Sequence, residues 1–207
     1  MAARVLLING SPRENGNTRL SIDVIANKLN EYDIETSAIN IGKNAIQGCI
    51  ACGMCAKLGR CTFKDKLYEE VYEILKNGID GFVLASPVYY GGPNGSVCAL
   101  MDRICYSLNR YMQFKPAASV AVCRRGGATA TFDRLNKYFM ILNMPIVSSQ
   151  YWNIVYGQSP GQAFLDEEGM QTMRTLATNM AWMIGRLDVR KHGHPDLEAP
   201  VRTNFIR

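Results

Sequence analysis

The stretch from Arg4 to Leu20 restricts the fold more than any other part of this chain. It begins with an apolar run, Val5–Ile8, and continues through a polar, glycine-containing loop, Asn9–Thr18, into a helical pattern of apolar residues. A short run that is apolar throughout is typical of a strand buried on both faces, as at the centre of a parallel sheet. Either Asn17 or Thr18 is suited to cap the helix. We therefore expect a strand–loop–helix unit whose loop meets the unpaired first amides of the helix.

This loop has the donors that hold a phosphate group. The N-terminus of a helix binds anions through its free backbone amides. The side chains add hydroxyl, amide and guanidinium donors, on Ser11, Arg13, Asn15, Asn17 and Thr18. Neither the P-loop pattern Gly-x-x-x-x-Gly-Lys-Ser/Thr nor the dinucleotide pattern Gly-x-Gly-x-x-Gly is present. We expect a phosphate site here, and an ordinary polar loop without a ligand is the alternative.

The segment Gly10–Thr18, with the pattern Gly-Ser-Pro-Arg-x-x-Gly-Asn-Thr, resembles the FMN-phosphate loop of the flavodoxin-like NAD(P)H-dependent oxidoreductases. That superfamily contains the NADPH-dependent FMN reductases and the iron–sulfur flavoproteins. The resemblance implies an FMN cofactor whose phosphate is bound by the donors of this loop. Later segments extend the resemblance over most of the chain.

A second segment, Ser86–Gly91, is similar to the part of the family that lines the flavin ring. A flavin needs a flat apolar or aromatic wall, and backbone amides directed at the edge of its ring tune its electronics. The resemblance implies that the ring is flanked by Pro87, Val88, Tyr89, Tyr90 and Gly91. A strand-end turn whose tyrosines only pack is the alternative.

A third segment, Arg124–Gly127, resembles another flavin-side loop of the family. Gly126 and Gly127 permit a close approach of the backbone to a ligand. Arg124 and Arg125 can bind a phosphate of FMN or of an incoming nicotinamide nucleotide, or can simply be solvated. The resemblance therefore adds Arg124 and both glycines to the expected FMN site.

Two shorter matches leave alternatives open. Asp102–Arg103 matches a pair in the family, with a catalytic role, a helix-surface ion pair and a subunit contact all open. Tyr151–Asn153 resembles a tyrosine-tryptophan-asparagine segment of close relatives, which implies a cap over a flavin, whereas a core tryptophan is the other possibility. Many relatives have a lysine where this chain has Cys98, so that local contact differs.

Four cysteines lie close together in a cysteine-rich loop at about residues 42–66. Cys49, Cys52, Cys55 and Cys61 are spaced so that three thiolates can converge on one cubane cluster, with the fourth supplied a few residues later. The spacing also resembles the compact motif of the iron–sulfur flavoproteins. These residues are conditional ligands of a 4Fe–4S cluster, and zinc, free thiols or a redox disulfide are the alternatives. The remaining cysteines are expected to be small core residues: Cys98, Cys105 and Cys123.

The rest of the chain predicts an α/β fold. Further apolar or alternating segments predict strands: Ile34–Ile41, Gly81–Ser86, Ala117–Cys123 and Pro145–Ser149. Helical patterns lie between and after them, at about 68–76, 97–108, 131–142 and 167–187. Alternating strands and helices predict a five-stranded parallel sheet covered on both faces, in three layers. The spacing fits the flavodoxin-like order 2-1-3-4-5, with a ligand at the carboxyl ends of strands 1 and 3. We expect one domain over residues 1–207 with an irregular tail from about residue 190.

Composition excludes several classes of function. The net charge of +5 is mild and its basic residues are scattered, which argues against nucleic-acid binding and suits anionic cofactors. No apolar run has the length of a membrane span, and no signal-peptide pattern is present. Seven cysteines without a secretory signal predict a reducing cytoplasm. His192 and His194 lie in the tail, so no histidine-based catalytic arrangement is indicated.

The expected function is that of an FMN-dependent oxidoreductase. It would take hydride from NAD(P)H and reduce a small acceptor such as a quinone, nitroaromatic, azo compound, free flavin or metal ion. The alternatives are an iron–sulfur flavoprotein that carries electrons between ferredoxin and a partner, and a flavin-binding regulator. The long cysteine-rich loop and the tail indicate a homo-oligomer, and the family resemblance implies a homodimer or homotetramer.

Overall fold

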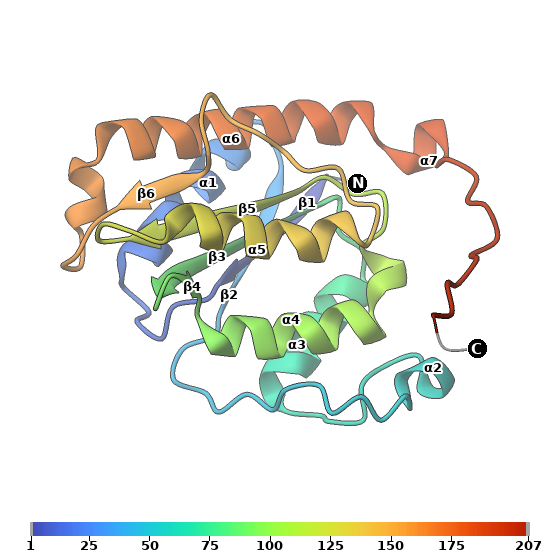
Figure 1. The fold of residues 1–207 in the computed structure, drawn as a ribbon. Coiled ribbons are helices and arrows are strands. Elements are labelled where there is room, and N and C mark those ends of the chain that lie inside the picture. The colour runs from blue at the N-terminus through green and yellow to red at the C-terminus, as the bar shows by residue number, and fades with distance from the viewer. Residues whose placement is uncertain (1, 206–207) are drawn as a thin grey trace.

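A parallel sheet runs through the centre of the protein (Figure 1), as a computed structural model of residues 2–205 shows. The six-stranded sheet has the order β2-β1-β3-β5-β6, and β4 pairs with β3 in an antiparallel hairpin. The bounds of the strands are β1 Arg4–Asn9, β2 Glu35–Asn40, β3 Gly81–Tyr89, β4 Gly92–Pro93, β5 Ala117–Cys123 and β6 Ile154–Tyr156. The predicted flavodoxin-like α/β fold is confirmed, with the small β4 as an addition.

The prediction of the fifth strand at 145–149 is wrong in position. Within that segment only Ile146 forms a bridge, to Ala117 at the start of β5. The chain then leaves the sheet and returns as β6, which pairs with the end of β5. The return begins at Asn153, whose carbonyl oxygen accepts the Ala121 N–H of β5 at 3.0 Å. The fifth position of the sheet is therefore split, and the residues between its two parts bulge outward.

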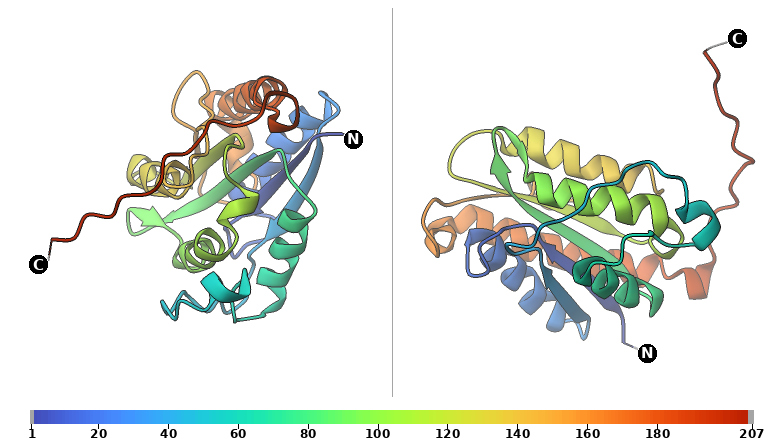
Figure 2. Two further views of the ribbon diagram at one scale, coloured as in Figure 1. Left: turned by 90° about the vertical axis from the view of Figure 1, so that its right-hand side faces the viewer. Right: turned by 90° about the horizontal axis from the view of Figure 1, so that it is seen from below.

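Helices cover both faces of the sheet (Figures 1 and 2). On one face lie α1 Asn17–Asn30 and α6 Glu167–Arg186, and on the other lie α3 Lys66–Lys76, α4 Gly95–Ser107 and α5 Ala128–Met140. The short helices are α2 Cys55–Leu58 and α7 Val189–His192, with 3-10 turns at η1 Asn109–Tyr111 and η2 Gln162–Leu165. Within residues 2–205 no helix is long and apolar enough to cross a membrane.

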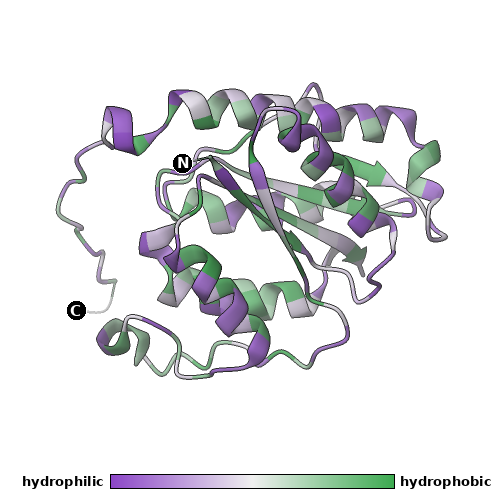
Figure 3. Ribbon diagram, turned by 180° about the vertical axis from the view of Figure 1, so that it is seen from behind, coloured by the Kyte–Doolittle hydropathy of each residue, from purple (hydrophilic) through white to green (hydrophobic). Residues whose placement is uncertain are grey.

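The alternation of β1 divides the core into two halves. Leu6 and Ile8 are buried with the helices α3, α4 and α5, whereas Val5 and Leu7 are buried with α1 and α6. Successive side chains of a strand point to opposite faces, so both faces of the central strand must be apolar. Most polar residues accordingly lie on the outer sides of the helices and in the loops (Figure 3), although the strands also hold buried polar side chains, Asn9, Ser86 and Ser119.

Two segments lie outside this layered body. Residues 41–65, called the cysteine loop below, contain only the short helix α2 and lie below α3 and α4 in Figure 1. The tail continues in helix α7 as far as His192, so it is irregular only from residue 193, slightly later than predicted. From there it extends away from the body (Figure 2), with the His194 ring stacked on Phe114 at 4.9 Å.

Gly10 stands where β1 leaves the sheet. Its N–H donates to the Ala85 carbonyl oxygen at 2.8 Å, and its own carbonyl oxygen accepts from Asn94 Nδ2 at 3.2 Å. A Cβ at this position would lie 2.1 Å from Val97 Cγ2 and 2.7 Å from the Ala85 oxygen. Only glycine therefore lets the first loop pass this close to β3 and the start of α4.

We expect Gly10→Ala to destabilise the fold by about 1–3 kcal/mol, because the added methyl meets backbone that cannot move aside. Gly185→Ala is the matched control, since a Cβ there meets no atom within 4 Å and the residue lies in α6. In a helix the same change stabilises by roughly 0.5–1 kcal/mol. Urea unfolding measures both, and equal effects of the two substitutions would contradict the steric explanation.

Candidate functional site

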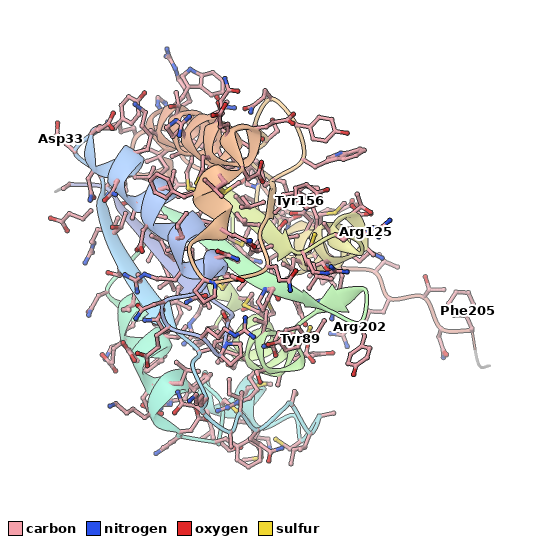
Figure 4. The ribbon with its side chains drawn as sticks, turned by 90° about the vertical axis from the view of Figure 1, so that its left-hand side faces the viewer. Asp33, Tyr89, Arg125, Tyr156, Arg202 and Phe205 are labelled. Carbon is pink, nitrogen blue, oxygen red and sulfur yellow. The ribbon has the colours of Figure 1, made fainter. Side chains whose placement is uncertain are left out.

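The carboxyl ends of the central strands meet at one edge of the sheet, and a loop leaves from each. Residues 10–16 follow β1, residues 90–91 follow β3, residues 124–127 follow β5 and residues 157–161 follow β6. Figure 4 shows Tyr89, Arg125 and Tyr156 together on this side of the molecule. This edge is where parallel α/β sheets bind their ligands, as the sequence predicts for strands 1 and 3.

A cavity of about 240 Å³, called the edge cavity below, opens between these loops. Residues from all four strand ends line it: Ser11, Arg13, Gly16, Asn17, Thr18, Pro87, Val88, Tyr89, Val122, Cys123, Arg124, Gly157, Gln158 and Pro160. Its first loop is polar, and Val88 and Val122 supply an apolar part. The cavity thus joins an anion-binding end to a less polar wall.

The edge cavity brings together most of the residues predicted for FMN. Those that line it are Ser11, Arg13, Asn17, Thr18, Pro87, Val88, Tyr89 and Arg124. The others lie beside it and not in its wall: Asn15, Tyr90, Gly91, Gly126 and Gly127. Among these, the side chains of Asn15 and Tyr90 are exposed to solvent. Contact of any of these thirteen residues with a cofactor stays a prediction.

The start of α1 differs from the predicted cap. The N-cap residue is Gly16, which has no capping side chain, and neither Asn17 nor Thr18 has that role. The preceding loop is held by its own turns, because Asn9 Oδ1 accepts the Ser11 N–H and Ser11 Oγ accepts the Arg13 N–H, both at 3.1 Å. The first amides of α1 therefore face the edge cavity without a side-chain partner, as anion binding requires.

Asn17 instead forms hydrogen bonds that hold the loop after β6, residues 157–161, which the sequence analysis did not predict as part of the site. Its Nδ2 donates to the Ser159 carbonyl oxygen at 3.0 Å, and its Oδ1 accepts the Ala163 N–H at 3.2 Å. A Cβ on Gly157 would lie 2.7 Å from Asn17 Nδ2, so this position requires glycine. The signal in the sequence is the run Gly157–Gly161, a glycine- and proline-containing segment directly after β6.

The second and third loops touch through their glycines. Gly127 has a φ of 85°, and a Cβ there would lie 2.7 Å from Gly91 Cα and 2.9 Å from Val88 Cγ1. Gly91 also has a positive φ, of 77°. Such backbone is readily adopted by glycine alone. The two glycines thus set the distance between the loops beside the edge cavity, without lining it.

Cys123 belongs to this wall, although the sequence predicted a core role for it. The residue is buried at the end of β5 and also lines the edge cavity. Burial raises the pKa of its thiol above the ordinary value. The thiol consequently stays neutral at physiological pH and adds no charge to the cavity. Cys123 also belongs to a core cluster, as predicted, whereas Cys105 is half-buried against the core, where burial raises the pKa of its thiol to about 12.

The cysteine loop forms a second cavity, of about 160 Å³, against α4. All four predicted ligands line this cysteine cavity: Cys49, Cys52, Cys55 and Cys61. Cys49 and Cys52 are exposed, whereas Cys55 and Cys61 are half-buried. Over residues 2–205 no three His, Cys, Asp or Glu side chains are close enough together to hold a metal ion. The thiols therefore share one cavity without converging on a ligation geometry.

Asp102 and Arg103 do not pair with each other, and of the two only Asp102 forms a helix-surface ion pair, with Arg134 of α5 at 4.0 Å. Arg103 is almost fully buried and pairs with Asp65, with Nη1 to Oδ2 at 2.5 Å. Asp102 faces α5, where it accepts the Tyr138 hydroxyl at 2.6 Å. Neither residue lines the edge cavity. Arg103 lines the cysteine cavity, which is where its role must be sought.

Tyr151 and Trp152 lie on the outward bulge before β6. Their rings are 4.8 Å apart, and the Trp152 side chain is 51% exposed, so the core-tryptophan alternative is wrong. Asn153 is the buried member of the segment, and its Nδ2 donates to the Ser119 carbonyl oxygen at 3.1 Å. The two aromatic rings, together with Tyr156, line a separate cavity of about 410 Å³.

Comparisons with known proteins agree with this arrangement. Residues 3–159 match the family model described as NADPH-dependent FMN reductase. An iron–sulfur flavoprotein of Methanocaldococcus jannaschii is 32% identical over 191 residues, which cover 87% of this chain and 97% of that protein.

Solved structures share the fold. RosB with bound 8-demethyl-8-formylriboflavin-5′-phosphate superposes with a TM-score of 0.69 at 14% identity, over 99% of this chain and 92% of that chain. A WrbA-like flavodoxin protein from Agrobacterium tumefaciens gives a TM-score of 0.63 at 15% identity, over 90% and 99% of the two chains. Together with the family match, these findings confirm the resemblance seen in the sequence. The chain belongs to the NADPH-dependent FMN reductase family.

Proposed function

We propose that this protein is an FMN-dependent oxidoreductase that takes hydride from NAD(P)H and reduces a small acceptor. The acceptor classes are a quinone, nitroaromatic, azo compound, free flavin or metal ion. The observation that carries the proposal is the edge cavity, in which an uncapped helix N-terminus and an apolar wall meet at the ligand-binding edge of the sheet. Family membership supports the flavin-dependent redox chemistry.

The first loop is suited to the phosphate of FMN. The free amides of α1 carry the positive end of the helix dipole, and the Ser11 hydroxyl and the Arg13 guanidinium line the same space. Thr18, at the start of the helix, is buried in the cavity wall. These donors fit a dianionic group, because charge-assisted hydrogen bonds to phosphate are among the stronger ones.

The second and third loops are suited to the ring. Pro87, Val88 and Tyr89 present apolar and aromatic surface, and the half-exposed Tyr89 can cover a planar ligand. Val122 and the neutral Cys123 thiol continue this wall from β5. Bound FMN supplies the hydride and electron chemistry, which needs no catalytic side chain from the protein. The residues of the chain bind the cofactor, orient it and shield one of its sides from water.

If the first loop binds the phosphate, Arg13→Gln weakens FMN binding about tenfold or more, the usual effect of losing a hydrogen bond to a charged group. Riboflavin lacks the phosphate, so its affinity should not change. Quenching of flavin fluorescence measures both. The matched control is Arg174→Gln, an exposed arginine of α6 that does not line the edge cavity. Equal weakening of FMN and riboflavin would count against the assignment, and absence of quenching by the unaltered protein would overturn the FMN site.

A second candidate function is favoured by the cysteine cavity. Four thiols on one cavity wall are a donor set that fits a 4Fe–4S cluster, which the loop could close around as it binds. The relative from M. jannaschii is named an iron–sulfur flavoprotein. With a cluster in the loop and FMN at the sheet edge, the protein would relay electrons from ferredoxin to a partner.

The source of electrons separates the two candidates. If the protein is a reductase, anaerobic mixing of the FMN-loaded protein with NADH or NADPH should bleach the flavin absorbance fast enough to account for turnover. Stopped-flow spectrophotometry records the rate of this bleaching. Free FMN at the same concentration is the control for direct reduction. Bleaching by reduced ferredoxin alone, with neither nicotinamide nucleotide active, would reject the reductase and support the carrier.

We also propose that the protein assembles as a homodimer or homotetramer. The aromatic pair Tyr151 and Trp152 and the extended tail from residue 193 are exposed in the single chain, and such surface is typical of interfaces. Light scattering at micromolar concentration should give a mass of at least twice 23.1 kDa. A mass equal to that of the monomer would refute the assembly.

A further inference from the structure

Arg103 is a buried cation that joins both ends of the cysteine loop. Its Nη1 donates to the Gln47 carbonyl oxygen at 3.3 Å on one side of the loop. On the other side, Nη1 donates to Asp65 Oδ2 at 2.5 Å and Nη2 donates to the Phe63 carbonyl oxygen at 2.7 Å. Its side chain has no exposed surface. A single guanidinium therefore closes the loop at its base.

The same residue is linked to Cys61 through a chain of hydroxyl groups. Ser107 Oγ donates to the Arg103 carbonyl oxygen at 2.6 Å and lies 2.7 Å from the Tyr68 hydroxyl. The Tyr68 hydroxyl oxygen accepts the Cys61 N–H at 2.8 Å. The backbone of the fourth cysteine is thus fixed relative to the guanidinium by buried groups of α3 and α4.

One donor of Arg103 is left without a partner. Its Nε is buried and forms no hydrogen bond among the described residues, whereas both Nη atoms are bonded. Arg103 lines the cysteine cavity together with all four cysteines. A buried N–H without a partner is costly, so it indicates a missing acceptor. In a cavity lined by four cysteines, the acceptor at hand is sulfur.

We propose that Arg103 is the positioning residue of an iron–sulfur site in the cysteine loop, where its Nε–H donates to a sulfur and its charge favours the reduced cluster. This inference rests on the 4Fe–4S cluster of the second candidate function. The residues present fit a 4Fe–4S cluster in three respects, which are the four thiols, the single cavity that they share and the unpartnered Nε–H of Arg103.

The physical effect expected of Arg103 is on the reduction potential. A cluster held by four thiolates is anionic, and one electron taken up from an external reductant makes it more so. Hydrogen bonds to the sulfurs and a fixed positive charge stabilise the reduced form and so raise the potential. Arginine suits both tasks, because its planar fork bonds the two loop ends while Nε–H remains for the sulfur. Lysine keeps the charge and lacks the fork.

Two variants and one control separate these contributions. Arg103→Gln removes the charge, the fork and the Nε–H, whereas Arg103→Lys removes the fork and the Nε–H and keeps the charge. Arg110→Gln is the matched control, because Arg110 also donates to the loop, to the Gly59 carbonyl oxygen at 2.8 Å, but is exposed. Each protein is reconstituted anaerobically with iron and sulfide and loaded with FMN. Iron, labile sulfide and flavin fluorescence are assayed, and the cluster is titrated with dithionite under EPR detection.

The expected result is a lower cluster potential in Arg103→Gln, with at least a tenfold smaller reduction equilibrium constant, which is about 59 mV for one electron. Arg103→Lys should give a smaller decrease and Arg110→Gln none. FMN quenching should be unchanged in all three, because the edge cavity does not contain these residues.

Several outcomes would overturn the inference. These are an unaltered potential in Arg103→Gln, an equal decrease in Arg110→Gln, or failure of the unaltered protein to take up iron and sulfide. If Arg103→Gln does not fold, Arg103→Lys decides, and a potential equal to that of the unaltered protein rejects the inference. FMN binding by the same samples is read separately, so a failed cluster does not count as a failed flavin site.

Discussion

The pairing of β1 with β3 is the constraint on which the candidate site depends. The two strands run in register from Val5 opposite Gly81 to Asn9 opposite Ala85. One further hydrogen bond, from Gly10 N–H to the Ala85 carbonyl oxygen, holds them together where the first loop departs. The first loop therefore departs beside Ala85, while β3 continues in the sheet as far as Pro87, so the polar loop lies beside the less polar end of β3.

The edge cavity and the cysteine cavity are held by different kinds of interaction. The edge cavity is built on strands whose side chains fill a continuous apolar core, and its loops need only glycine contacts and short turns. In the cysteine loop Ile41 is buried in the core, whereas Ile50, Met54 and Leu58 are exposed. An ion pair between the buried Arg103 and the half-buried Asp65 ties the loop to α3 and α4. The loop is thus held to the rest of the protein largely by polar contacts.

Local patterns in the sequence were enough to find most of the elements and the first loop. The apolar run before Gly10 and the 3.6-residue periodicity after Thr18 are properties of neighbouring residues, so β1 and α1 could be recognised without any tertiary contact. The segment at 145–149 also contains β-branched apolar residues, Ile146 and Val147, yet it forms only one bridge. Its pairing depends on where the buried Asn153 side chain reaches Ser119, and no local pattern records that contact.

The sequence by itself determined the order of strands and helices, the loop types at the strand ends and the presence of four clustered cysteines. Those features follow from side-chain periodicity and from the backbone preferences of glycine and proline. Only the tertiary structure decided that Asn17 fastens the loop after β6, that Gly127 meets Gly91, and that Arg103 is buried behind the cysteines. Each of these contacts joins residues distant in sequence, and its formation depends on the packing of several elements at once.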